Sequence, residues 1–159
     1  MSTYHLDKLF SPRSVVVVGG SPRRTSPGRA VVKNLRGGGF KGAIHIINPH
    51  YRDIEGIRSV QSFEDLQDAP DLMVIATPAA TVPSIVAAAG KKGIPTGIII
   101  TAGLGHGAGS LAEACEKAAR ANGLRLVGPN CLGILAPHAR LNASFSANTP
   151  RPGDLALIS

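Results

Sequence analysis

Short, almost continuously hydrophobic runs alternate along this chain with stretches in which apolar residues recur every three or four positions. Runs of the first kind are typical of strands buried on both faces of a parallel sheet. They are rich in valine and isoleucine and end in turn-forming residues, as strands do. The pattern predicts strands at residues 15–18, 43–47, 72–76, 96–100 and 124–127.

The intervening stretches predict helices at residues 28–36, 82–89 and 111–122. Ser110 and Glu113 form a capping box at the start of the last helix, and Gly123 is a favourable residue for its end. A weaker capping-box pattern predicts that a short helix begins at residues 62–65. Strands and helices that alternate at this spacing predict an α/β fold: a Rossmann-like, doubly wound, mainly parallel sheet with helices on both faces.

The 159 residues suffice for one domain with a hydrophobic core, and 43% apolar with 17% charged residues is a globular composition. No apolar run approaches the roughly 18–20 residues that a membrane-spanning helix needs, and the first residues do not resemble a signal peptide. The two cysteines, Cys115 and Cys131, are too few for a disulfide framework. We therefore expect a cytoplasmic protein without a membrane segment.

The formal net charge of +7 favours an anionic partner. Nucleic acid is disfavoured, because only 4% of residues are aromatic, tryptophan is absent, and neither zinc-finger spacing nor a long basic helix occurs. Metal-ligand spacing is likewise missing from the sequence.

The predicted strands end in chemically similar turns of small, hydroxyl-bearing and amide residues, at positions 19–22, 48–51, 77–80, 101–104 and 128–133. In open α/β sheets, ligands bind beyond the carboxyl ends of the strands. Such a row of turns suits an extended ligand that lies across this edge.

The first of these turns joins a strand to a helix N-terminus, where backbone N–H groups and the helix dipole favour a phosphate group. It differs from the dinucleotide fingerprint, which would need glycines where Ser21 and Arg24 stand. The second turn lacks the acidic residue that usually binds the ribose of NAD. Its basic surroundings, with His50 and Arg52, suit a ribose that carries a phosphate, as in NADP or coenzyme A (CoA).

Together the motifs resemble the CoA-binding domain of nucleoside-diphosphate-forming acyl-CoA synthetases, the family of succinyl-CoA synthetase alpha subunits and ADP-forming acetyl-CoA synthetases. Residues 141–146 are also similar to the synthetase-like half of Pat-type bifunctional protein acetyltransferases. The resemblance covers nearly the whole chain. Its motifs, in order, are VVVVGGSPR (15–23), GFKG (39–42), INP (47–49), PDL (70–72), ATPA (76–79), TAG (101–103) and GPNCLGI (128–134).

The resemblance implies a set of CoA-binding residues spread over five strand ends. The phosphates would lie at the first loop, the adenosine at the second and third, the pantetheine at the third and fourth, and the thiol at the last. His50 stands where the family often has lysine, so Tyr51 or Arg52 could supply that contact. The implied residues are Gly19, Gly20, Ser21, Pro22, Arg23, Asn48, Pro49, His50, Tyr51, Thr77, Pro78, Ala79, Thr101, Ala102, Gly103, Asn130 and Cys131.

The resemblance further implies that residues 1–153 form the CoA-binding domain and that residues 154–159 begin a following domain. The family's phosphohistidine and ATP-grasp parts are missing from this sequence. The chain is therefore expected to be a non-catalytic part of an acid–CoA ligase (ADP-forming), whose other domains or subunit are its partners and bind ATP and Mg. His106 is expected to be an exposed loop residue, Cys131 a small packing residue, and Asp71 and Asp154 structural.

Two other classes of function fit the same pattern less well. An NADP-binding oxidoreductase module would use the same edge of the sheet. The absence of fingerprint glycines at positions 21 and 24 counts against it. A regulatory domain that senses a nucleotide would show comparable binding of ATP, NAD and CoA, or of none.

Overall fold

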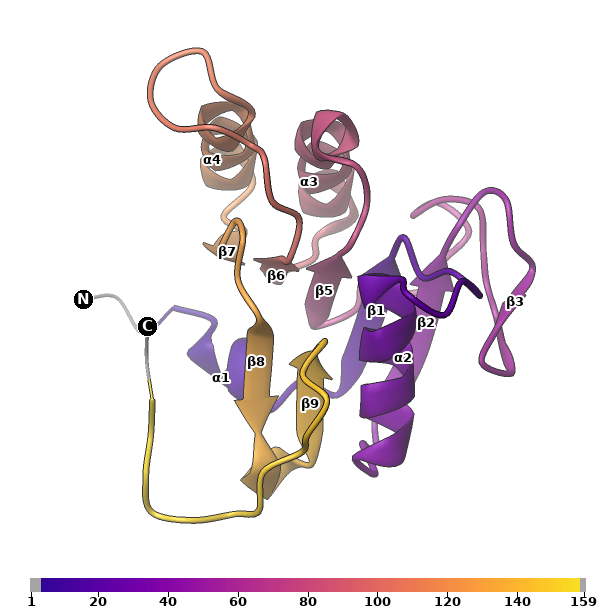
Figure 1. The fold of residues 1–159 in the computed structure, drawn as a ribbon. Helices are drawn as coiled ribbons and strands as arrows, with labels where there is room; N and C mark the ends of the chain where they lie inside the picture. The colour runs from indigo at the N-terminus through magenta and orange to yellow at the C-terminus, as the bar shows by residue number, and fades with distance from the viewer. Residues whose placement is uncertain (1–3, 158–159) are drawn as a thin grey trace.

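The computed structural model describes residues 4–157 and confirms the predicted α/β fold. Within this part of the chain, the main sheet is parallel throughout and has the order β2-β1-β5-β6-β7 (Figure 1). The strand order reverses between β1 and β5, which makes the sheet doubly wound. The strands are β1 (Ser14–Val18), β2 (Ala43–Ile47), β5 (Leu72–Ile75), β6 (Thr96–Ile99) and β7 (Arg125–Val127).

Helices cover both faces of this sheet. Helices α3 (Val82–Lys92) and α4 (Leu111–Ala121) pack side by side on one face, whereas α2 (Pro27–Gly37) lies on the other (Figure 1). Short elements complete the fold: α1 (Leu6–Phe10) and the 3₁₀ turns η1 (Ala79–Thr81) and η2 (Pro137–Ala139).

The side chains of β1 alternate between two hydrophobic clusters. Val16 and Val18 pack toward α3 and α4, while Val15 and Val17 pack toward α2. All four are at most 4% exposed. Burial on both faces explains why the strand reads as a continuous apolar run.

Two small antiparallel hairpins were not predicted from the sequence. The first, β3 (Asp53–Ile54) with β4 (Ile57–Arg58), follows β2. The second, β8 (Gly133–Ala136) with β9 (Leu141–Ser144), packs against α2 and covers the sheet where a further helix could lie.

The predicted short helix at residues 62–65 is wrong. The Asp65 carboxylate accepts hydrogen bonds from the N–H groups of Gln61 and Ser62, at 3.2 and 3.0 Å, and folds the segment into a turn. Residues 155–157 form no strand or helix, and Leu155 is fully exposed. Residues 158 and 159 lie outside the described residues.

Other expectations for local structure are confirmed. At the start of α4, Ser110 Oγ accepts a hydrogen bond from the Glu113 N–H at 3.1 Å. In a capping box, the Glu113 carboxylate would accept a hydrogen bond from the N–H of Ser110. Here it accepts from the N–H of the preceding residue, Gly109, at 2.7 Å. Asp71 is structural: it accepts hydrogen bonds from Lys8 Nζ at 2.9 Å and from the Arg13 N–H at 2.8 Å.

Candidate functional site

The loop between β1 and α2 is built on close backbone contacts. Gly19 has φ +88°, and a Cβ there would lie 2.7 Å from the carbonyl oxygen of Ala76. A Cβ on Gly28, in the first turn of α2, would lie 2.5 Å from the Gly19 carbonyl oxygen. The third fingerprint glycine normally permits such helix–loop contact. Here Gly28 permits it from position 28 instead of 24, so the loop is longer than the dinucleotide fingerprint.

The longer loop places polar groups beside the N-terminus of α2. Ser26 is the N-cap of this helix and accepts a hydrogen bond from the Arg29 N–H at 3.5 Å. Arg23 and Arg24 are exposed, and the Arg23 N–H donates to Ser21 Oγ at 3.3 Å. Since a helix N-terminus carries positive partial charge, the loop favours an anion.

Asn48 joins this loop to the end of β2. It is 8% exposed, and its Nδ2 donates to the carbonyl oxygen of Gly20 at 2.6 Å. Its Oδ1 accepts from the N–H groups of His50 and Tyr51, at 2.7 and 3.2 Å. Asn48 therefore acts as a positioning residue, because its side chain is bonded within the protein.

The ends of β5, β6 and β7 form one continuous edge. Thr101 Oγ1 donates to the carbonyl oxygen of Thr77 at 2.7 Å, and the Asn130 N–H donates to that of Thr101 at 3.1 Å. Next to Asn130, Cys131 Sγ lies 3.4 Å from the carbonyl oxygen of Ile99. Burial raises the pKa of the Cys131 thiol, which suits packing better than nucleophilic attack.

A cavity of about 990 Å³ lies over the ends of β1, β2 and β5. This size is typical of a small-molecule site. Nine predicted residues line it: Gly19, Ser21, Arg23, Asn48, Pro49, His50, Tyr51, Thr77 and Pro78. The other predicted residues are not part of its lining: Gly20, Pro22, Ala79, Thr101, Ala102, Gly103, Asn130 and Cys131.

The sequence prediction missed one wall of this cavity. It consists of residues 61–64 and of Thr81, Ser84, Ile85 and Ala88 at the start of α3. Backbone pairing brings the first segment there, because the Asn48 N–H donates to the carbonyl oxygen of Val60 at 2.9 Å and Ile47 bridges to Val60. A single isolated bridge leaves no periodic signal in the sequence. Thr25 and Ser26 also line the cavity and were missed.

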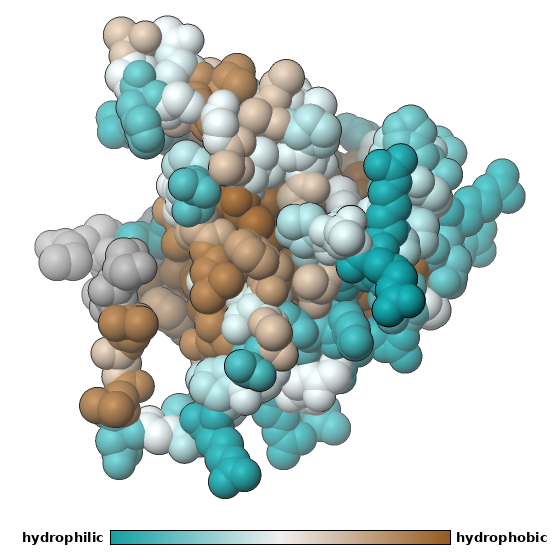
Figure 2. All heavy atoms as spheres, in the orientation of Figure 1, coloured by the Kyte–Doolittle hydropathy of each residue, from teal (hydrophilic) through white to brown (hydrophobic). Residues whose placement is uncertain are grey.

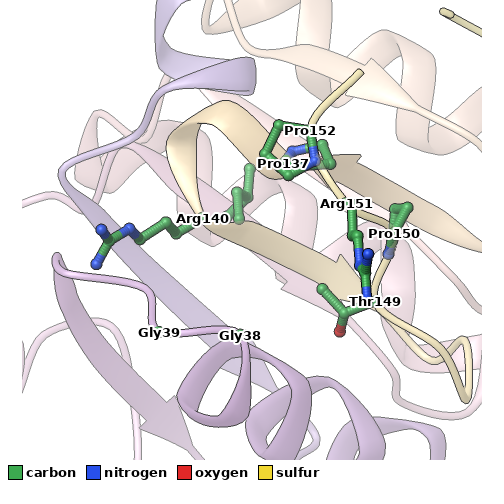
Figure 3. A pocket seen from close by; sticks show the side chains of 9 residues that line it. Gly38, Gly39, Pro137, Arg140, Thr149, Pro150, Arg151 and Pro152 are labelled. Carbon is green, nitrogen blue, oxygen red and sulfur yellow. The ribbon is translucent and has the colours of Figure 1, made fainter.

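A second cavity, of about 360 Å³, lies at the opposite edge of the sheet, beside the C-terminus of α2 (Figure 3). It is lined by prolines, glycines and two arginines, and Figure 3 shows Arg140 extending away from Arg151. None of the predicted site residues lies there.

Within residues 4–157, no cluster of three or more potential metal ligands occurs. The same part of the chain holds no helix long and apolar enough to cross a membrane. His106 is exposed in the loop before α4, as expected, and Cys115 is buried in the core.

Comparison with known proteins shows the family of this chain. Residues 13–137 match a family model described as CoA binding domain. The chain belongs to the CoA-binding domain family. A curated relative, the acetate–CoA ligase [ADP-forming] of Methanocaldococcus jannaschii, is 39% identical over 157 residues, which are 98% of this chain and 22% of the relative. The alpha subunit of the acetate–CoA ligase [ADP-forming] I of Pyrococcus furiosus is 35% identical, over 97% of this chain and 35% of that subunit.

Solved structures give the same result. One is the dinucleotide forming acetyl-coenzyme A synthetase 1 of Ca. Korarchaeum cryptofilum, solved in complex with phosphate and ADP. It matches with a TM-score of 0.81 and 35% identity, over 88% of this chain and 30% of that chain. PH0766 from Pyrococcus horikoshii matches with a TM-score of 0.82 and 34% identity, over 88% of this chain and 33% of that chain. The CoA-binding domain thus spans about a fifth to a third of these longer proteins.

Proposed function

We propose that this domain binds CoA along the carboxyl edge of its sheet. The adenosine diphosphate part lies in the 990 Å³ cavity, and the pantetheine arm runs past Thr77 and Thr101 toward Asn130 and Cys131. The observation that carries this proposal is the continuity of the edge. Hydrogen bonds join the ends of β5, β6 and β7 side by side, from the cavity to Cys131.

The phosphates of CoA lie at the β1–α2 loop in this arrangement. Backbone N–H groups at the N-terminus of α2, the Ser21 hydroxyl and the Arg23 guanidinium all favour an anion there. Exposed Arg24 adds positive charge to the same loop. The remaining residues of the loop and edge — Gly20, Pro22, Ala79, Ala102 and Gly103 — offer backbone groups and little side-chain bulk along this path.

In a longer enzyme, the domain would hold CoA so that its thiol displaces phosphate from an acyl phosphate made by other domains, which bind ATP and Mg. Such an enzyme is an ADP-forming acyl-CoA synthetase or a bifunctional acetyltransferase of the Pat type. Relatives are named for acetate, 4-hydroxybutyrate and trans-feruloyl groups. Because one domain type serves such different acyl groups, we assign acyl selection to the other domains.

An exposed apolar patch beside the proposed thiol end supports partners of this kind. Leu132 and Phe145 are 48% and 40% exposed, and the Phe145 N–H donates to the carbonyl oxygen of Leu132 at 3.3 Å. Figure 2 shows hydrophobic side chains gathered over the region of β7 and β8. The rest of the synthetase, present in the longer relatives, is the partner that we propose for this patch.

Titration calorimetry with CoA and 3′-dephospho-CoA tests the proposed function. We expect CoA to bind, and to bind more weakly to Arg23→Ala by about tenfold, the loss of one charge-assisted hydrogen bond to phosphate. Arg120→Ala is the matched control, because it removes the same charge from the exposed end of α4. Absence of heat above background with both ligands would refute CoA binding.

The comparisons favour CoA over NADP as the ligand. A prephenate dehydrogenase with bound NAD+ has a TM-score of 0.53 to this chain but only 24% identity, which shows a shared fold alone. The end of β2 carries Asn48, bonded within the protein, where a dinucleotide site would place a carboxylate.

A further inference from the structure

The large cavity has two chemically different halves. The half beside the β1–α2 loop presents Ser21, Arg23 and Ser26, which suit phosphate. The other half is lined by residues 61–64 and by Ile85 and Ala88 of α3. Hydrophobic groups, the Gln61 amide, the Ser62 hydroxyl and the Glu64 carboxylate line this second half, and none of these lining residues is a cation. Its chemistry therefore suits a neutral ring with hydrogen-bond donors at its edge.

Residues 61–64, called here the 61–64 shelf, are held rigidly at the mouth of the cavity. The Asp65 carboxylate accepts hydrogen bonds from the N–H groups of Gln61 and Ser62 and from the Ser62 hydroxyl at 3.1 Å. Phe63 and Leu66 anchor the segment in the core, at 5% and 6% exposure. With these two side chains turned inward, those of Gln61 and Glu64 remain at the surface, where both line the cavity.

Polar groups on neighbouring walls are already engaged within the protein. Asn48 bonds to the Gly20 carbonyl and to two N–H groups of its own turn. The Thr81 hydroxyl lies 2.8 Å from the carbonyl oxygen of Pro78, and Ser84 Oγ donates to the carbonyl oxygen of Thr81 at 2.8 Å. The Thr81 and Ser84 oxygens can still accept a hydrogen bond, but the strongest acceptor in the cavity lining formed by residues 4–157 is the Glu64 carboxylate of the shelf.

Glu64 is the shelf residue with the most distinctive chemistry. The Glu64 carboxyl is exposed, and its own backbone N–H is the largest cause that lowers its pKa, so the group is ionised at neutral pH. An ionised carboxylate only accepts hydrogen bonds, and its two oxygens offer about four acceptor positions. The exposed Glu64 carboxylate can thus accept a hydrogen bond from an amino group of a ligand.

Resting on the proposed function, we infer that the 61–64 shelf recognises the nucleobase and that Glu64 selects adenine over a 6-oxo purine. The purine ring packs beside Phe63, Ile85 and Ala88, and its exocyclic amino group donates to the Glu64 carboxylate. Hypoxanthine has a carbonyl oxygen at that position. Two acceptors would then face each other, and the unmade hydrogen bond disfavours the complex.

The test compares the binding of CoA with that of its analogue in which hypoxanthine replaces adenine, by titration calorimetry. The unaltered chain is expected to prefer CoA by about tenfold, the value of one discriminating hydrogen bond. Glu64→Gln should reduce the preference to less than about threefold, because an amide can donate to a carbonyl as well as accept from an amine. Asp68→Asn removes the same charge from an exposed residue outside the cavity lining and should retain the full preference.

Two results would overturn the inference: equal binding of the two ligands by the unaltered chain, or an undiminished preference in Glu64→Gln. If CoA still binds tightly, either result would refute only the role of the 61–64 shelf and would be consistent with the proposed function. Failure of the unaltered chain to bind CoA at all would remove both.

Discussion

Gly28 and Asn48 shape the phosphate loop from opposite sides. Gly28 lets the first turn of α2 contact the Gly19 carbonyl, and Asn48 holds the Gly20 carbonyl from the end of β2. The loop conformation thus depends on one missing side chain and one buried amide. Neither residue needs to contact the ligand through its own side chain in order to matter for binding.

Replacement of Gly28 by alanine tests this view of the loop. A Cβ at 2.5 Å from a backbone oxygen forces α2 or the loop to move. We expect Gly28→Ala to lower the free energy of unfolding by about 1–3 kcal/mol, as overpacking does, and to weaken CoA binding strongly. Urea denaturation and calorimetry measure the two effects.

Gly37→Ala is the matched control, since a Cβ at this last residue of α2 would meet nothing within 4 Å. It should be neutral or slightly stabilising, given the higher helix propensity of alanine. Comparable decreases in the free energy of unfolding and in CoA affinity in both variants would contradict a specific role for the close contact at Gly28.

At the scale of elements, Asp71 connects α1 to the sheet. It stands at the start of β5 and accepts hydrogen bonds from Lys8 in α1 and from the Arg13 N–H before β1. Burial raises the pKa of the Asp71 carboxyl, but the Arg13 N–H and the Lys8 ammonium lower it by more, so the pKa lies below its usual value. A carboxyl of this kind stabilises the fold only while it is ionised.

The pH dependence of stability tests the role of Asp71. Because its folded pKa is depressed, its contribution is fully present above the ordinary carboxyl pKa and is lost as the pH falls through the folded value. Asp71→Asn should therefore lower Tm at neutral pH, and the difference from the unaltered chain should shrink in acid.

Thermal unfolding between about pH 7 and pH 3 measures this difference, across the range in which carboxyl groups protonate. Asp154, which the sequence suggested to be structural, is exposed, so Asp154→Asn should leave Tm nearly unchanged throughout. A gap between Asp71→Asn and the unaltered chain that stays constant with pH would contradict an ionic role.

Helices and strands with a clear pattern of hydrophobic positions were predictable from the sequence. Elements whose conformation depends on local polar contacts were not. β1, β5 and β6 read as apolar runs because both of their faces are buried. Hairpin β8–β9 lacks such a signal, since Asn142 and Ser144 are buried in it as polar residues. Their buried side chains are satisfied by local partners: Asn142 Nδ2 donates to Thr149 Oγ1, and Ser144 Oγ donates to Asn142 Oδ1 at 2.6 Å. Asn34, distant in sequence, donates to the Ser144 carbonyl.

The same difference applies to the site. The turns that end the strands were predictable because parallel strands carry all their carboxyl ends to one edge. The 61–64 shelf was not, because the Asp65 carboxylate competes with helix formation at residues 62–65. The function of Gly28 also depends on a contact distance that the sequence does not display.

For the whole molecule, we propose that CoA binds at the carboxyl edge of the sheet and that the opposite edge does not bind it. The carboxyl edge holds the large cavity, and the exposed patch of Leu132 and Phe145 adjoins its far end at Cys131. The amino edge holds the smaller cavity with Arg140 and Arg151 (Figure 3). Both cavities are lined by arginine residues, so each is a possible position for an anionic ligand. An experiment that locates the ligand distinguishes between them.

Chemical-shift mapping by NMR on the ¹⁵N-labelled chain, titrated with CoA, is the most direct test of this placement. We expect the largest changes in the amides of residues 19–26 and 61–64, with further changes at Thr101, Asn130 and Cys131. Changes confined to Gly38, Gly39, Arg140 and Arg151 would contradict this placement.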